Sequence, residues 1–187
     1  LSLHDALPIS GKTLHVLGSH PTPPSFDDGQ VAQASDAHPV DWNGRRNHDE
    51  IRFWAEYIKA DAADWIVDDQ GKKGPIAATE RFVILGDLNA DPLDGNSMNR
   101  AILQLLDHPL VLSTPVPRSE GAGAFIKKDY HAREEKTSRF HLRCDYVLPS
   151  KQGCRIEQSA VHWPVGDKVV DEASDHRLVW VDLSLVP

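Results

Sequence analysis

The chain has 187 residues, enough for one domain with a sizeable core, and 40% of them are hydrophobic. Its formal net charge is −8, from 28 acidic and 20 basic residues, which disfavours a broad basic surface that would hold nucleic acid. No apolar run reaches the roughly 20 residues that cross a bilayer, so we expect no membrane span.

The first ten residues do not look like the start of a domain. They contain no initiator Met, and the string LSLHDALPIS resembles the translation of a sequencing-adapter oligonucleotide. We therefore expect residues 1–10 to be a non-native leader and residues 11–187 to belong to the domain. The native amino terminus would then be absent. The compartment stays open, with secretion or a periplasmic location among the alternatives.

Two strands and a helix are predicted in the first half of the chain. Residues 12–18 have the pattern of a short buried strand, and the continuous apolar run 81–85 is typical of a strand covered on both faces. Between them, Asn47 as N-cap with Glu50 three residues later predicts a helix start. The apolar stripe of that helix would consist of Ile51, Trp54, Ala55, Ile58, Ala62 and Trp65.

The second half begins with a shorter helix that Ser97 would cap. Residues 113–139 are polar and without periodicity, and we interpret them as a loop that is either functional or mobile. Three further strands are predicted at 141–148, 155–162 and 177–185.

Only two cysteines occur, Cys144 and Cys154. Their spacing matches no zinc-binding motif. We favour two ordinary thiols over a disulfide, and the cysteine count does not identify the compartment.

The strongest chemical pattern is Gly-Asp-Leu-Asn at residues 86–89, directly after the buried strand. The carboxyl end of a strand is where α/β folds usually place reacting groups. Asp87 and Asn89 are two residues apart, so in extended backbone both side chains point to the same side. A carboxylate beside a carboxamide can orient a water molecule. A solvated turn is the alternative, because Asp and Asn favour turns.

Three weaker patterns accompany it. Asp175 and His176 precede the last strand, where a carboxylate and an imidazole suit metal contact and hydrogen donation. Asp145 lies inside a predicted strand, and a buried carboxylate needs a partner. His20 follows the first strand. Each of these patterns alone is more often structural than functional.

The order of the four patterns resembles the endonuclease/exonuclease/phosphatase family of deoxyribonuclease-I-like, metal-dependent phosphoesterases. That family includes nucleases, inositol-polyphosphate phosphatases and sphingomyelinases. The resemblance covers nearly all of residues 12–186, and it is specific because the 86–89 and 174–176 motifs occur together. It implies an α/β (α+β) four-layer sandwich of two β-sheets flanked by helices, with the active site at the strand ends.

The resemblance also implies roles for individual residues. His176 would contact the scissile phosphate, and Asp145 would orient an active-site histidine, here His176. Asp87 and Asn89 would position or deprotonate the attacking water.

The resemblance implies roles for two further positions. His20 matches a second histidine of the deoxyribonuclease-like members, and Asp175 matches a carboxylate close to the metal. The implied cofactor is Mg²⁺, with Mn²⁺ or Ca²⁺ as alternatives, and it would neutralise the charge that develops on the phosphate oxygens.

One expected feature is absent from the pattern. The family's principal metal ligand is a glutamate in the amino-terminal half of the domain, and the resemblance begins after it. We therefore expect residues 11–187 to be the carboxy-terminal portion of a phosphoester hydrolase. The full-length protein would be the enzyme, whereas this fragment would be inactive, because the remaining carboxylates make a weak Mg²⁺ site.

Other interpretations stay open. A catalytically inactive fragment or interaction module of the same fold is the main alternative, and the net charge disfavours a DNA-binding protein without chemistry. The sequence does not distinguish nucleic acid from a phosphorylated small molecule as substrate, nor endonuclease from exonuclease or phosphatase. It does not predict an oligomeric state.

Overall fold

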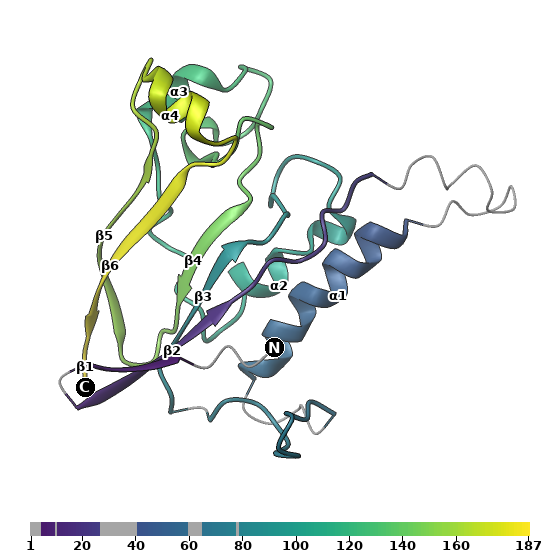
Figure 1. Ribbon diagram of the computed structural model, residues 1–187, viewed down its shortest axis with the longest axis vertical. Helices are drawn as coiled ribbons and strands as arrows, with labels where there is room; N and C mark the ends of the chain where they lie inside the picture. The colour runs from purple at the N-terminus through teal and green to yellow at the C-terminus, as the bar shows by residue number, and fades with distance from the viewer. Residues whose placement is uncertain (1–4, 10, 27–40, 60–64, 78) are drawn as a thin grey trace, which may run out of the picture.

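A computed structural model describes most of the chain, namely residues 5–9, 11–26, 41–59, 65–77 and 79–187. These residues form two β-sheets with helices packed around them (Figure 1). The larger sheet has four strands in the order β1-β2-β3-β4, and the smaller one pairs β5 with β6.

The larger sheet mixes parallel and antiparallel pairs. Strand β2 (Lys12–Gly18) runs parallel to β3 (Phe82–Asp87), and β3 runs antiparallel to β4 (Asp145–Pro149). The predicted strands at 12–18 and 81–85 are confirmed. Strand β4 begins later than the predicted residue 141.

Strand β1 (Asp5–Ile9) lies within the segment that we expect to be a leader. Its main chain pairs antiparallel with β2, from Asp5 opposite Val16 to Ile9 opposite Lys12. The pairing does not identify the origin of the segment, so its non-native character stays a prediction.

The smaller sheet consists of β5 (Cys154–His162) and β6 (Leu178–Leu185), which pair antiparallel with a register shift between Ile156 and Gln158. Both strands were predicted. Figure 1 shows this pair on one side of the four-stranded sheet, with α1 and α2 on the other side.

The long helix α1 (Trp42–Tyr57) begins earlier than predicted. Its N-cap is Asp41, whose Oδ1 accepts a hydrogen bond of 2.6 Å from the Gly44 amide. The prediction that Asn47 caps the helix is wrong. Asn47 is buried within α1, and its side-chain amide donates to the carbonyl oxygens of Thr22 and Leu88.

Glu50 is not part of a capping box either, because its carboxylate accepts a hydrogen bond from the Thr22 amide at 2.6 Å. The helix ends at Tyr57, before the end of the predicted stripe. Ala62 lies outside the described residues, and Trp65 is exposed beyond the helix.

The predicted second helix is two short pieces, η2 (Met98–Arg100) and α2 (Leu103–Leu106). Asn99 and Arg100 both have φ of 51°, a left-handed conformation that does not continue an α-helix. Ala101, Ile102 and Leu105 of this segment are fully buried.

Three more short helices were not predicted. Helices α3 (Glu120–Phe125) and η3 (Arg133–Glu135) lie within the segment interpreted as a loop, and α4 (Lys168–Ala173) precedes β6. Ser119 and Asp167 cap α3 and α4 through their side-chain oxygens. Helices this short have little periodicity for sequence analysis to detect.

The larger sheet is covered on both faces, as the continuous apolar run of β3 predicts. On one face, Phe82 and Ile84 pack with side chains of α1 and α2. On the other face, Val83 packs with Leu14 and Cys154. Burying each large side chain contributes about 1.5–3 kcal/mol, so this packing fixes the strand ends firmly.

Two broader expectations can be compared with the structure. Cys144 and Cys154 are both buried free thiols, as the sequence favoured. Within the described part of the chain, no helix combines the length and apolar character that crossing a membrane requires.

Candidate active site

The sheet topology brings three chain segments to one edge. Parallel strands β2 and β3 end at the same edge, and antiparallel β4 begins there. Asp87, the last residue of β3, lies directly opposite Asp145, the first residue of β4. Side chains directly opposite each other in a sheet share a face, so the two carboxylates are neighbours despite their separation in sequence.

Gly86 allows the loop after β2 to approach β3 closely. Its φ is 139°, and a Cβ at this position would lie 1.9 Å from the carbonyl oxygen of Ser19. A side chain at residue 86 would therefore push the two strand ends apart. The close approach places His20 Nε2 3.4 Å from Asp87 Oδ2, while the His20 side chain stays 71% exposed.

His176 is held by Asp145. Its Nδ1 lies 2.9 Å from Asp145 Oδ2 and 3.1 Å from Oδ1, and the Thr137 hydroxyl donates to the same Oδ2 at 2.6 Å. The hydrogen bond to Asp145 raises the pKa of His176, although burial acts in the opposite direction. With Nδ1 committed to Asp145, Nε2 is the nitrogen left for other partners.

Asp87 faces that second nitrogen, with Oδ2 3.8 Å from His176 Nε2. Its other oxygen accepts a hydrogen bond of 2.9 Å from the Asn89 amide. Burial raises the pKa of Asp87, and the hydrogen bond from Asn89 offsets part of this effect. Asn89 has φ of 51°, and its side-chain amide donates to the Pro21 carbonyl at 3.0 Å. The Asn89 side chain thus braces the loop after β2.

Asp87, Asp145 and His176 form a compact set of potential metal ligands. One ligand atom from each lies within 4.8 Å of the others, and all three side chains are half-buried. Two carboxylates suit a hard divalent cation, and Mg²⁺ prefers six oxygen ligands in octahedral geometry. The described residues therefore fit such an ion in donor type, but they supply only part of its coordination.

Asp175 stands apart from this set. It is exposed, and its main-chain oxygen accepts a hydrogen bond of 2.8 Å from the Arg139 amide. Its charge contributes to the raised pKa of His176, so it is close enough to act electrostatically. Its predicted role near the metal stays a prediction.

Two polar residues that support His176 had no signal in the sequence. Thr137 bridges to Asp145, as described above. Arg177 is 3% exposed and its guanidinium donates to the carbonyl oxygens of Ser174 and His176 and to the Asp171 carboxylate. It also lies over the Trp163 ring at 4.3 Å. Contacts that depend on the tertiary fold leave no pattern of spacing along the chain.

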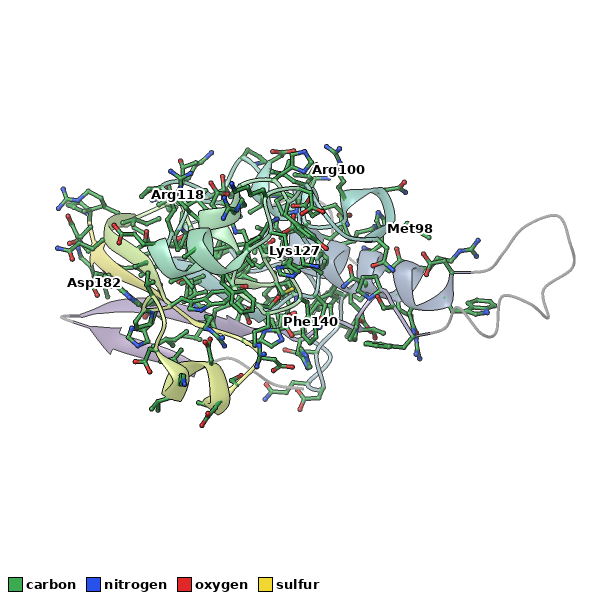
Figure 2. The ribbon with its side chains drawn as sticks, turned by 90° about the horizontal axis from the view of Figure 1, so that it is seen from above. Met98, Arg100, Arg118, Lys127, Phe140 and Asp182 are labelled. Atoms are coloured by element: carbon green, nitrogen blue, oxygen red, sulfur yellow. The ribbon has the colours of Figure 1, made fainter. Side chains whose placement is uncertain are left out.

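The surroundings of the site are aromatic and charged, with Asp49 and Glu50 as well as arginines in the neighbouring cavity wall. Phe140, labelled in Figure 2, is 56% exposed, and its ring lies edge-on to His176 with 6.0 Å between centroids. On the other side, His20 and Gly86 line a cavity of about 1530 Å³. The rest of its wall includes Arg45, Arg46, Phe53, Trp54 and Trp65.

Comparison with known proteins identifies a family. The model of the Endonuclease/Exonuclease/phosphatase family matches residues 7–176. No curated protein matches the chain.

Two solved structures are similar to the chain. An endonuclease/exonuclease/phosphatase from Beutenbergia cavernae DSM 12333 superposes with a TM-score of 0.53 and 18% identity, over 93% of this chain and 36% of that one. Sphingomyelinase C from Streptomyces griseocarneus superposes with a TM-score of 0.40 and 17% identity, over 95% of this chain and 52% of that one. The chain thus spans about a third and about half of their lengths, and at these identities the likeness to the first concerns the fold alone.

Proposed function

Because the chain belongs to the endonuclease/exonuclease/phosphatase family, we propose that it carries part of the active site of a divalent-metal-dependent phosphoester hydrolase. Members of this family are generally hydrolases of phosphoesters. The observation that carries the proposal is the convergence of Asp87, Asp145 and His176, from three distant segments, within 4.8 Å. We also propose that the two sheets and their helices form a four-layer sandwich.

The proposed role of Asp145 is to orient His176. A carboxylate that accepts from Nδ1 selects the tautomer with the proton on Nδ1 and leaves Nε2 directed toward the substrate, and protonation adds a donor at Nε2. The raised pKa of His176 favours this protonated form. His176 would then donate a hydrogen bond to a phosphate oxygen as negative charge builds up during cleavage.

The proposed role of Asp87 is to hold and deprotonate the attacking water, with Asn89 beside it. A carboxylate within hydrogen-bond reach of a water molecule can orient it and accept its proton. His20, which is exposed and lies 3.4 Å from the same carboxylate, would donate a second hydrogen bond to the substrate.

A divalent cation, Mg²⁺ or alternatively Mn²⁺ or Ca²⁺, would be held by the Asp87 and Asp145 carboxylates with oxygen ligands from outside the cluster. When bound, it would neutralise charge on the phosphate oxygens. We propose Asp175 as a further carboxylate near the ion. Because the described cluster supplies few ligands, we expect this chain alone to be inactive and the full-length protein to hydrolyse phosphoesters.

The test is hydrolysis of a generic phosphodiester by the full-length protein, with Mg²⁺ and with chelator. His176→Ala should lower the rate roughly 10²–10⁴-fold, and Asp145→Asn should lower it less, because it acts through His176. The exposed His162 offers a matched control, and His162→Ala should keep full activity. Full activity of His176→Ala would exclude the assigned role. Absence of chelator-sensitive turnover would favour an inactive interaction module instead.

A further inference from the structure

A buried ion pair lies next to the candidate active site. The Lys136 side chain is 1% exposed, and its Nζ lies 2.7 Å from Asp91 Oδ2 and 2.5 Å from Asp94 Oδ2. The Asp91 side chain is 0% exposed. Lysine is almost never fully buried, because desolvating its charge is costly unless a partner is close. The fold therefore keeps this charge in place through close and specific contacts.

Asp91 connects two segments of the site. Its Oδ1 accepts hydrogen bonds from the amides of Leu93 and Asp94, which shape the loop after β3. Its Oδ2 accepts a hydrogen bond of 2.6 Å from the Arg143 amide, two residues before Asp145. The loop that follows Asp87 is thus joined to the chain that leads into β4.

Lys136 adds a third segment through its neighbour in sequence. The Thr137 hydroxyl donates to Asp145 Oδ2 at 2.6 Å and accepts from the amides of Cys144 and Asp145 at 3.0 and 3.1 Å. The Thr137 carbonyl accepts from the Arg177 amide at 2.8 Å, and Ser138 forms a β-bridge with His176. Thr137 therefore contacts Asp145 through its hydroxyl and the residue that follows His176 through its carbonyl oxygen.

We infer that the Lys136–Asp91 ion pair is a positioning device for Asp145 and His176. It anchors residue 136 in the interior, so that the next residue, Thr137, holds its hydroxyl against Asp145 Oδ2. Asp145 in turn orients the His176 imidazole. Lys136 and Asp91 act through Thr137, and neither is placed at the reacting atoms.

The competing explanation is that the ion pair only stabilises the fold. The two explanations predict faster amide exchange in different parts of the chain when the ion pair is removed. A general stabiliser protects every core amide equally, because exchange then requires global unfolding, whereas a positioning contact protects its own neighbourhood.

The experiment uses NMR on the isotope-labelled chain in buffer with chelator. The first readout is the downfield Nδ1 proton of His176, which reports its hydrogen bond to Asp145. The second is amide exchange at Cys144 and Asp145, whose amides donate to Thr137, compared with Ile84 in the middle of β3.

In Lys136→Met we expect loss of the downfield resonance. Exchange at Cys144 and Asp145 should accelerate about tenfold or more beyond the acceleration at Ile84, which reports the loss of global stability. Thr137→Val should reproduce both effects with the ion pair intact, and Thr137→Ser should restore the resonance. Asp94→Asn is the matched control. It removes the more exposed partner of Lys136 and should keep the resonance, because Asp91 remains.

If Lys136→Met does not fold, the double variant Asp91→Asn/Lys136→Met removes both fully buried charges, while Asp94, whose side chain is 11% exposed, keeps His131 as a partner at 2.8 Å. We expect the same selective loss in it. A retained resonance in either variant, or exchange that accelerates uniformly along the chain, would overturn the inference. The inference takes its catalytic meaning from the proposed function, but these readouts need no turnover. Failure of the hydrolysis assay and failure of this positioning are therefore separately visible.

Discussion

Two neighbouring clusters of charged side chains differ in how well their carboxylates are paired. The poorly paired cluster contains Asp87, Asp145 and His176, and the well-paired cluster contains Asp91, Asp94 and Lys136. Asp87 lies 3.4 Å from His20 and 3.8 Å from His176, and its side chain is 21% exposed. Asp91, only four residues further on, is fully buried and 2.7 Å from the Lys136 ammonium.

The surrounding hydrogen bonds widen this difference. Both oxygens of Asp91 are saturated by main-chain amides and Lys136. Asp87 accepts one such bond, from the Asn89 amide, and keeps its second oxygen facing two imidazoles. A fully satisfied carboxylate has no capacity left for a ligand, whereas a partly satisfied one can bind a cation or a proton.

Burial raises the pKa of a carboxylate in both clusters, but the partners compensate to different degrees. At Asp87 it raises the pKa, because the partners compensate only partly for lost hydration. Asp94 experiences the same penalty, yet Lys136 and His131 outweigh it and lower its pKa. The quality of pairing, more than residue type or position in the loop, therefore determines whether the pKa of a carboxylate here is raised or lowered.

The largest effect that we expect concerns the well-paired cluster. Lys136→Met should lower the free energy of unfolding by about 3–5 kcal/mol, because it leaves the buried Asp91 carboxylate without its cation. Urea denaturation measures this. The control is Lys128→Met at an exposed position, which should change stability by less than about 0.5 kcal/mol. Equal effects of the two substitutions would show that the buried pair contributes nothing specific.

A smaller effect of opposite sign is expected at the poorly paired cluster. The folded state raises the pKa of Asp87, so ionised Asp87 destabilises the fold above the pKa of the unfolded chain, and the penalty vanishes below it. Asp87→Asn removes the charge and should stabilise the protein at pH 7, with the gain declining toward pH 3.

Thermal melts across this pH range test the prediction. Asp182→Asn is the control, since Asp182 is exposed on β6 and well separated from Phe140 in Figure 2. It should leave the pH dependence of the melting temperature nearly unchanged. Destabilisation by Asp87→Asn at pH 7 would mean that Asp87 is better paired than its distances to His20 and His176 indicate.

The sequence predicted the poorly paired cluster better than the well-paired one. Asp87 follows a continuous apolar run, and such a run at a strand end is visible in the sequence. The family, and with it two sheets surrounded by helices, could be recognised from the motifs around Asp87 and His176. Lys136, in contrast, lies in a polar segment, and lysine is normally exposed. Its partner Asp91 is 45 residues away.

The errors in the helices have a similar origin. Asp41 and Asn47 are both good N-cap residues, so propensity alone does not choose between them. The choice depends on Asn47 reaching the carbonyl oxygens of Thr22 and Leu88, which only the folded chain brings together. Local patterns thus predict strands and strand ends, while buried polar contacts require the tertiary structure.

The smallest effect that we expect is a change in the pKa of His176 when its hydrogen-bond partner Asp145 is replaced. In the folded chain, the hydrogen bond to Asp145 raises the pKa of His176 above that of an unfolded histidine, about 6.5. Protonated His176 therefore stabilises the fold. This contribution is fully present below the unfolded pKa and is lost as the pH rises through the folded pKa.

Asp145→Asn removes both the charge and the ionic hydrogen bond, so the pKa of His176 should fall, because the remaining burial lowers it. An NMR titration of the imidazole in metal-free buffer measures this, with His176→Gln to assign the resonance. Asp175→Asn is the matched control. Its charge is the weakest of the contributions that raise this pKa, so the fall should be smaller. If Asp175→Asn shifted the pKa as far as Asp145→Asn does, the histidine would be responding to the summed negative charge of the loop, and the contrast between specific and diffuse pairing would not hold for His176.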